Sequence, residues 1–286
     1  MTTPKIPFYK MSGSGNDFIL VDNREGIVDE KDLSRWVSRV CRRRQSVGAD
    51  GLILIEPSLE ADFKWRFFNS DGGQVEMCGN GGRCVARLAH FLGIAGPDLS
   101  FETVAGLIQA EVKGKRVKLE MPRPSGVMTD YMIDVDGKQV SVNSIVVGVP
   151  HVVIRVADIE QAPVLPMGRE IRYHQRYAPA GTNVNFVQIG DDGSLLIRTY
   201  ERGVEDETLA CGTGSVASAL LASIKDETGS PATVLTRGGE VLNIHFQRRE
   251  VDFFEVFLEG DTTMVYEGAL WDEAVEYSDK EEKSES

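Results

Sequence analysis

One tetrapeptide pattern, Cys-Gly-x-Gly, occurs twice in the chain. The first copy begins at Cys78 and the second at Cys211, and each opens a stretch whose apolar residues recur at helical spacing. Such a stretch presents an apolar stripe to a core, so each cysteine is predicted to lie at or just before a helix N-terminus. Because the N–H groups of a first helical turn favour negative charge, each copy predicts a place for an anion, either a thiolate or a ligand carboxylate.

The two copies belong to a longer internal repeat. The cysteines are 133 positions apart, and a Thr-x-x-Gly motif at Thr103 recurs at the same interval at Thr236. Equal spacing of a cysteine corner, a helix and a second motif predicts two homologous domains, with a cleft at their interface. Pro122 and Pro124 interrupt any regular element between the copies, so the expected domains cover residues 1–123 and 124–261.

Composition restricts the function classes. The chain has 286 residues and a formal net charge of −13, which argues against binding to nucleic acid or to an anionic membrane surface. No apolar run reaches the roughly 20 residues that span a bilayer, and we expect a cytoplasmic protein with free cysteines. The cysteine and histidine spacing predicts no metal site. The polar residues 278–286 are expected to form a disordered acidic tail.

Several longer motifs carry a resemblance to a known family. The chain resembles the diaminopimelate epimerases, which interconvert LL- and meso-2,6-diaminopimelate without a cofactor, for lysine and peptidoglycan precursor biosynthesis. The similarity runs from residue 10 to residue 268. Its most specific stretches are Phe68-Asn69-Ser70-Asp71-Gly72, Met77-Cys78-Gly79-Asn80-Gly81-Gly82-Arg83-Cys84, Pro150-His151, and Tyr200-Glu201-Arg202-Gly203 followed by Ala210-Cys211-Gly212-Thr213-Gly214.

The resemblance implies a fold and a set of partners. The fold is α/β (α+β), with two pseudo-symmetric domains that are each a β-barrel-like sheet around a central helix, and with the active site in the cleft between them. Residues 262–277 are expected to return to the N-terminal domain. The implied partner is a small-molecule substrate, diaminopimelate, and a homodimer is a further expectation from the family.

The resemblance also assigns roles to individual residues. Cys78 and Cys211 correspond to the catalytic pair, and His151 and Glu201 to the neighbours that tune the thiols. The positions that correspond to substrate ligands, through side chains or backbone groups, are Asn16, Asn69, Gly79, Asn80, Asn183, Glu201, Arg202, Gly212 and Thr213.

The residue types suit a particular reaction. Inverting an α-carbon without a cofactor requires a base on one face and an acid on the other, and one thiolate with one thiol supplies both. A free cysteine has a pKa of roughly 8.5, so the site must favour the thiolate. We expect a protonated His151 and the helix ends to favour it, and the Glu201 carboxylate to disfavour it or to accept a proton.

Three alternative functions stay open. Many members of the family carry Asn where this chain has Val149, and Gln where it has Gly51. These departures allow a racemase or epimerase of the same fold that acts on another amino acid. A thiol redox switch would also use two cysteines, although no Cys-x-x-Cys motif supports it. The last alternative is a non-catalytic binding module.

Overall fold

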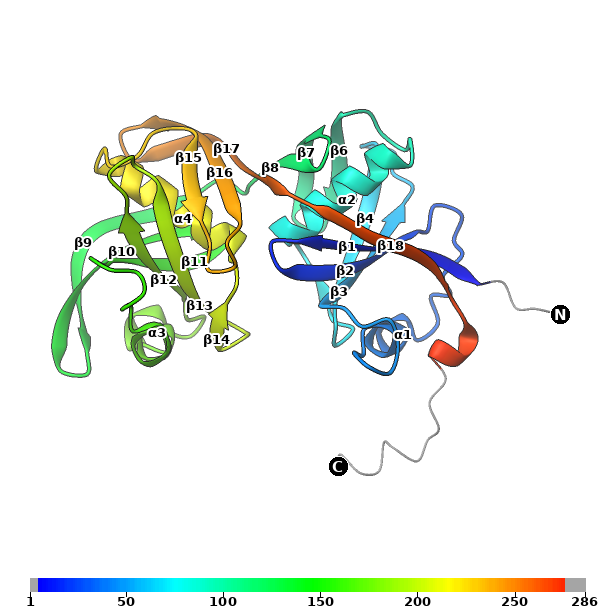
Figure 1. Ribbon diagram of the computed structural model, residues 1–286, viewed down its shortest axis with the longest axis horizontal. Coiled ribbons are helices and arrows are strands. Elements are labelled where there is room, and N and C mark those ends of the chain that lie inside the picture. The colour runs from blue at the N-terminus through cyan, green and yellow to red at the C-terminus, as the bar shows by residue number, and fades with distance from the viewer. Residues whose placement is uncertain (1–4, 276–286) are drawn as a thin grey trace, which may run out of the picture. The chain divides into compact units, whose positions relative to one another are not determined.

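The computed structural model describes residues 5–275, so the predicted tail at 278–286 lies outside the described residues. The chain divides into two compact units (Figure 1). Within the described residues, unit 1 contains residues 5–117 and 262–275, and unit 2 contains Lys118–Asp261. The division precedes the position that the prolines indicated, because strand β8 (Arg116–Glu120) runs across it to pair with strand β17 of unit 2.

The described part of unit 1 contains a mixed sheet and two α-helices. The strands pair in the order β18–β1–β2–β3–β4–β6–β7, and the pairs β2/β3 and β4/β6 are parallel, whereas the other pairs in this series are antiparallel. Strand β5 adds to β4. The elements are β1 (Ile6–Gly13), β2 (Asn16–Asp22), α1 (Leu33–Val40), β3 (Gly51–Glu56), β4 (Phe63–Asn69), β5 (Gln74–Val75), α2 (Gly79–Phe91), β6 (Asp98–Thr103), β7 (Gly106–Lys113), β18 (Thr263–Leu270) and the 3-10 turn η2 (Asp272–Ala274).

Unit 2 repeats this plan. Its strands pair in the order β9–β10–β11–β12–β13–β15–β16–β17, with β11/β12 and β13/β15 parallel, and β14 adds to β13. The elements are β9 (Ser125–Val135), β10 (Lys138–Val147), β11 (Val149–Arg155), α3 (Val164–Arg172), the 3-10 turn η1 (Gln175–Tyr177), β12 (Asn183–Ile189), β13 (Leu195–Glu201), β14 (Asp206–Thr208), α4 (Gly212–Ile224), β15 (Ala232–Leu235), β16 (Val241–Arg249) and β17 (Asp252–Asp261).

The two units therefore share one topology. Parallel and antiparallel pairs alternate in the same sequence, and β18 borders β1 as β9 borders β10. Helices α2 and α4 both have 13 residues and begin 133 positions apart. The repeat confirms the predicted fold of two pseudo-symmetric α/β domains. The Thr-x-x-Gly motifs lie in the turns β6–β7 and β15–β16, where Gly106 and Gly239 adopt positive φ angles of 114° and 81°.

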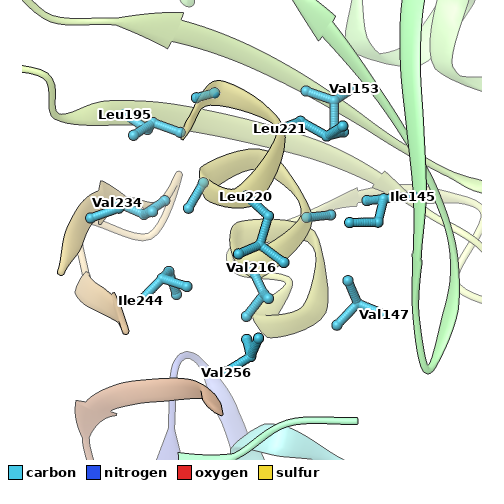
Figure 2. Packing of buried hydrophobic residues seen from close by; sticks show 14 of the residues in the cluster. Ile145, Val147, Val153, Leu195, Val216, Leu220, Leu221, Val234, Ile244 and Val256 are labelled. Atoms are coloured by element: carbon cyan, nitrogen blue, oxygen red, sulfur yellow. The ribbon is translucent and has the colours of Figure 1, made fainter. Parts of the chain in front are cut away.

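Each sheet wraps around one helix. Helix α4 is buried along most of its length, and the hydroxyls of its buried serines, Ser215, Ser218 and Ser223, donate to carbonyls of the preceding turn. Figure 2 shows Val216, Leu220 and Leu221 of this helix facing apolar side chains from the strands around it. Burial of apolar area stabilises a fold by roughly 25 cal/mol per Å², so this cluster contributes to the stability of the unit.

Strand β3 of unit 1 is buried on both of its faces. Leu52 and Leu54 pack in the cluster that includes helix α1, whereas the alternate residue Ile53 lies against Gly81 of helix α2. Because successive side chains of a strand point to opposite faces, this arrangement explains the continuous apolar run in the sequence. Phe63, Trp65 and Phe67 alternate along strand β4 and are all buried, so they form one core-facing side of that strand.

Two elements were not expected from the sequence. Helix α3 contains Pro166 and Gly168, and both residue types are unfavourable in the interior of a helix. Strand β9 is mostly exposed and lacks a clear apolar alternation. Across residues 5–275, no helix is long and apolar enough to cross a membrane.

Candidate active site

The first cysteine caps helix α2. Cys78 has an extended backbone (φ −145°, ψ 117°), and its Sγ accepts a hydrogen bond from the N–H of Gly81 at 3.5 Å. Its side chain is half-buried, and Gly79 and Asn80 form the start of the first helical turn. The sequence predicted this position, because a Cys followed by glycines leaves the turn before a helix unhindered. A sulfur at this place meets N–H donors and the positive end of the helix dipole.

The second cysteine occupies the N-cap position of helix α4, where, unlike Cys78, its side chain makes no capping hydrogen bond. Cys211 is 7% exposed and has an extended backbone, and its Sγ lies 3.6 Å from Oγ1 of Thr213. The carbonyl of Cys211 accepts hydrogen bonds from the backbone N–H and from the hydroxyl of Ser215. Gly212 and Thr213 thus correspond in position to Gly79 and Asn80. The other two cysteines, Cys41 and Cys84, are buried in the core of unit 1.

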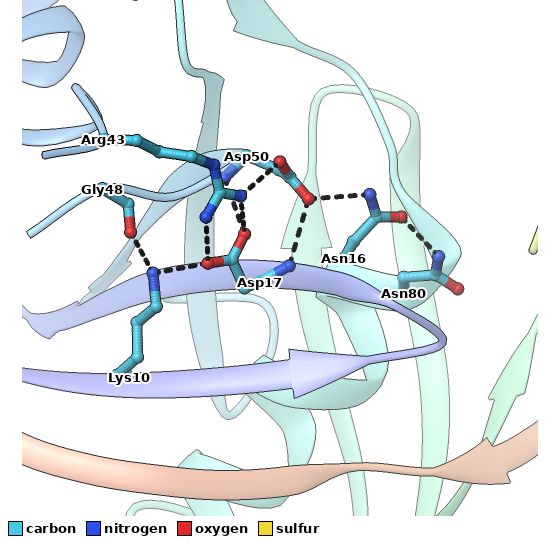
Figure 3. A network of polar contacts seen from close by, with 7 residues as sticks. All are labelled: Lys10, Asn16, Asp17, Arg43, Gly48, Asp50 and Asn80. Carbon is cyan, nitrogen blue, oxygen red and sulfur yellow. Dashed lines mark hydrogen bonds and ion pairs between the residues drawn. The ribbon is translucent and has the colours of Figure 1, made fainter. Parts of the chain in front are cut away.

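Asn16 and Asn80 contact each other through their amides. Nδ2 of Asn80 donates to Oδ1 of Asn16 at 2.8 Å, and Nδ2 of Asn16 donates to Oδ2 of Asp50 at 3.0 Å (Figure 3). Asn16 begins strand β2, where the hairpin turn from β1 ends. Asn69 is the last residue of β4 and is exposed. Unit 1 therefore presents two of its predicted ligands, Asn16 and Asn80, as one connected pair.

The predicted ligands of unit 2 lie at the ends of strands. Asn183 begins β12, is buried, and its Oδ1 accepts the backbone N–H of Arg202 at 2.8 Å. The guanidinium of Arg202 donates to the carbonyl of Ala180 at 3.1 Å. Glu201 ends β13, and its Oε2 accepts the hydroxyl of Thr208 at 2.8 Å. Burial raises the pKa of Glu201, and the hydrogen bond from Thr208 opposes that rise.

His151 is fully enclosed in unit 2. Burial, with a smaller effect of the positive charge of Arg202, lowers the pKa of His151 to about 3. The imidazole is therefore neutral near neutral pH, and our expectation of a protonated His151 is wrong. The physical reason is desolvation, which penalises the charged ring more than the sequence could indicate.

Sequence reasoning missed a residue that orients this histidine. Asn185 is 0% exposed. Its Nδ2 donates to the carbonyl of Val152 at 2.9 Å and lies 3.2 Å from Nδ1 of His151, while its Oδ1 accepts the hydroxyl of Thr199 at 3.0 Å. The carbonyl and the hydroxyl together define which end of the amide is nitrogen, so Nδ1 of His151 is the acceptor and its proton resides on Nε2. An Asn inside an apolar strand was the available signal.

No metal centre emerges from these residues. Among residues 5–275, no group of three or more His, Cys, Asp and Glu side chains is arranged to hold a metal ion. The described residues instead contain two thiols at helix N-termini. Unit 1 adds the linked amides of Asn16 and Asn80, and unit 2 adds the neutral imidazole of His151 and the buried carboxyl group of Glu201.

Comparison with known proteins identifies the family of this chain. A family model described as diaminopimelate epimerase matches residues 8–127 and 143–265. The chain belongs to the diaminopimelate epimerase family. This confirms the resemblance that the motifs indicated.

Curated members of the diaminopimelate epimerase family match along nearly their whole length. The diaminopimelate epimerase of Aquifex aeolicus is 48% identical over 283 residues, which are 95% of this chain and 100% of the relative. The diaminopimelate epimerase of Archaeoglobus fulgidus is 42% identical over 279 residues, which are 93% of this chain and 96% of the relative.

Solved structures outside this family share its fold. A Bacillus anthracis phenazine biosynthesis protein of the PhzF family has a TM-score of 0.71 at 14% identity, with 94% of this chain and 99% of that chain covered. A probable proline racemase from Agrobacterium radiobacter K84 has a TM-score of 0.68 at 14% identity, with 96% and 97% covered. At this identity the likeness shows the fold alone, and it agrees with the duplicated architecture described above.

One departure from the common diaminopimelate epimerase pattern has a structural explanation. A Cβ atom on Gly51 would lie 2.6 Å from both the ring of Phe67 and the carbonyl oxygen of Phe68, so the neighbouring strand leaves no room for a side chain. The other departure, Val149, begins strand β11 two residues before His151.

Proposed function

We propose that this chain epimerises LL-2,6-diaminopimelate to meso-diaminopimelate without pyridoxal phosphate, by a two-base mechanism that uses one thiolate and one thiol. The reaction would serve lysine and peptidoglycan precursor biosynthesis. The observation that carries the proposal is the placement of Cys78 and Cys211 as N-caps of equivalent helices in a repeated fold. Family membership over most of the chain supports the choice of substrate.

The chemistry assigns complementary roles to the two cysteines. The thiolate removes the α-proton from one face of the α-carbon, and the thiol returns a proton to the opposite face, so configuration inverts. The roles exchange in the reverse direction. Each thiolate is favoured by the positive end of the helix that its cysteine caps. Since the two thiols act on one substrate, their titration belongs to the pair rather than to either residue.

The helix ends also suit the charge that develops during the reaction. Loss of the α-proton spreads negative charge onto the α-carboxylate. Backbone N–H groups of Gly79 and Asn80, and of Gly212 and Thr213, are the first-turn donors that would stabilise it. Such donors act without reorganisation, because the helices hold them in place before the substrate binds.

The remaining predicted site residues bind the substrate or tune the ionisation of the thiols. Asn16, Asn69, Asn183 and Arg202 are proposed ligands of the substrate's carboxylate and ammonium groups. Glu201, whose pKa burial raises, would accept a proton or bind an ammonium group. His151 would act as a neutral hydrogen-bond donor through Nε2, since Nδ1 faces the amide of Asn185.

The test is α-proton exchange and epimerisation of LL-diaminopimelate in deuterated water. The wild type should epimerise, and Cys78→Ser and Cys211→Ser should each lose most of the activity. Cys41→Ala is the matched control: burial raises the pKa of the Cys41 thiol to about 12, so this cysteine stays protonated and its replacement should leave turnover intact. A folded wild type that exchanges the α-proton of another amino acid, but not of diaminopimelate, would replace the substrate and retain the mechanism.

A further inference from the structure

Four side chains of unit 1 form a directed chain of hydrogen bonds. Nη2 of Arg83 donates to Oδ1 of Asn80 at 3.1 Å, Nδ2 of Asn80 donates to Oδ1 of Asn16 at 2.8 Å, and Nδ2 of Asn16 donates to Oδ2 of Asp50 at 3.0 Å. Figure 3 shows the last two of these links. The chain connects the first turn of helix α2 to the beginning of strand β2 and to the loop before β3.

The charged ends determine the direction of both amides. A guanidinium can only donate hydrogen bonds, and an ionised carboxylate can only accept them, whereas an amide can present either end. Rotating the Asn16 amide by half a turn would place its oxygen against the oxygen of Asp50 and its nitrogen against the nitrogen of Asn80. Both contacts would be repulsive, so the ends of the chain impose one orientation on Asn16 and Asn80 alike.

Asp50 is itself held in place from several sides. Its Oδ2 accepts the backbone N–H of Asp17 at 3.2 Å, and its Oδ1 accepts Nη2 of Arg43 at 2.8 Å. Arg43 also pairs with Asp17, and Lys10, which is 6% exposed, pairs with Asp17 at 2.8 Å. Although burial acts to raise it, the hydrogen bonds from Arg43 and Lys10 lower the pKa of Asp17 below its usual value. Lys10, Asp17, Arg43 and Asp50 therefore form a cluster of paired charges that contacts Asn16 through Asp50.

We propose that Asp50 is a positioning residue that makes Asn16 a hydrogen-bond donor to the substrate. With its oxygen occupied by Asn80 and one N–H occupied by Asp50, Asn16 has its second N–H left to offer. An N–H suits a carboxylate and not an ammonium group. The inference rests on the proposed function, because it takes Asn16 to be a substrate ligand. It specifies that Asn16 binds an anionic group of that substrate.

Two replacements of Asp50 distinguish this role from simple structural support. In Asp50→Asn the shape is kept, but Arg43 retains the new amide oxygen, so the new NH₂ group confronts the donor of Asn16. Asp50→Ala leaves Asn16 unrestrained without opposing it. We expect Asp50→Asn to lower kcat/KM by about tenfold, mainly through a higher KM, and to be at least as harmful as Asp50→Ala. A structural role predicts the opposite ranking, because the isosteric variant would then be the milder one.

A double-mutant cycle with Asn16→Ala completes the test. If Asp50 acts through Asn16, the Asp50→Asn change should alter kcat/KM by less than about twofold once Asn16 is alanine. Asp62→Asn is the matched control, since Asp62 is an exposed carboxylate of the same unit that accepts a backbone N–H from Ser100. Thermal unfolding of each variant verifies that it folds.

The possible outcomes are separable. Additive effects of Asp50→Asn and Asn16→Ala, or a milder effect of Asp50→Asn than of Asp50→Ala, would overturn the positioning role while wild-type epimerisation stands. A wild type that does not exchange the α-proton of diaminopimelate would overturn the proposed function, and with it the assignment of Asn16 to that substrate.

Discussion

Replacing Gly214 with alanine should disrupt the surroundings of Cys211. A Cβ atom at residue 214 would lie 2.2 Å from Oδ1 of Asn185 and 3.2 Å from Sγ of Cys211. Asn185 is fully buried and held by hydrogen bonds to Val152 and Thr199, so it cannot move aside without losing them. Overpacking costs about 1–3 kcal/mol, and an unsatisfied buried polar group costs about 1–3 kcal/mol more.

The helix itself offsets part of this loss. Alanine is favoured over glycine in a helix interior by about 1 kcal/mol. The net expectation is that Gly214→Ala lowers the free energy of unfolding by roughly 3 kcal/mol and that epimerase activity falls as well, because the new methyl group presses on Cys211. Urea denaturation followed by circular dichroism measures the first effect, and the deuterium exchange assay measures the second.

The repeat supplies a matched control for this experiment. Gly81 is the third residue of helix α2, as Gly214 is of helix α4. A Cβ atom on Gly81 would lie 3.2 Å from Cδ1 of Ile53, the end of a flexible side chain. Gly81→Ala should therefore stay within about 1 kcal/mol of the wild type. Equal destabilisation by the two changes would refute the reasoning, since it would show that Asn185 is not the obstacle.

Three further predictions concern ionisation in unit 2. Because the pKa of His151 is lowered to about 3 in the folded state, the unfolded chain binds a proton at this residue first as the pH falls. The free energy of unfolding should therefore decline from about pH 6.5 toward about pH 3. His151→Gln should flatten that decline when acid denaturation is measured. Asn185→Asp places a carboxylate beside Nδ1 and should raise the pKa of His151, as an NMR titration would report; an unchanged pKa would argue against the contact. Thr208→Val removes the hydrogen bond that lowers the pKa of Glu201, so the acidic limb of the pH profile of kcat/KM should shift to higher pH. An unmoved limb would mean that Glu201 does not titrate in the reaction.

Much of the fold could be predicted because its signals are local. The glycines after Cys78 and Cys211 mark helix starts, and the alternation of Phe63, Trp65 and Phe67 marks a strand. The 133-residue interval between the cysteines indicated a duplicated architecture. Helix α3 escaped prediction because its Pro166 conflicts with local helix preference, and its packing against the sheet of unit 2 decides the outcome instead.

The family and the identities of the proposed site residues also followed from the sequence, because contiguous motifs carry them. What only the tertiary structure decided are pairings between distant residues and the states that burial imposes. Asp50 meets Asn16 across 34 positions, and Asn185 meets His151 across the same interval, without a motif that links either pair. The neutral His151 shows the same limit. Residue identity supplies the ionisable group, but the solvent that folding removes from around it determines whether the group is charged.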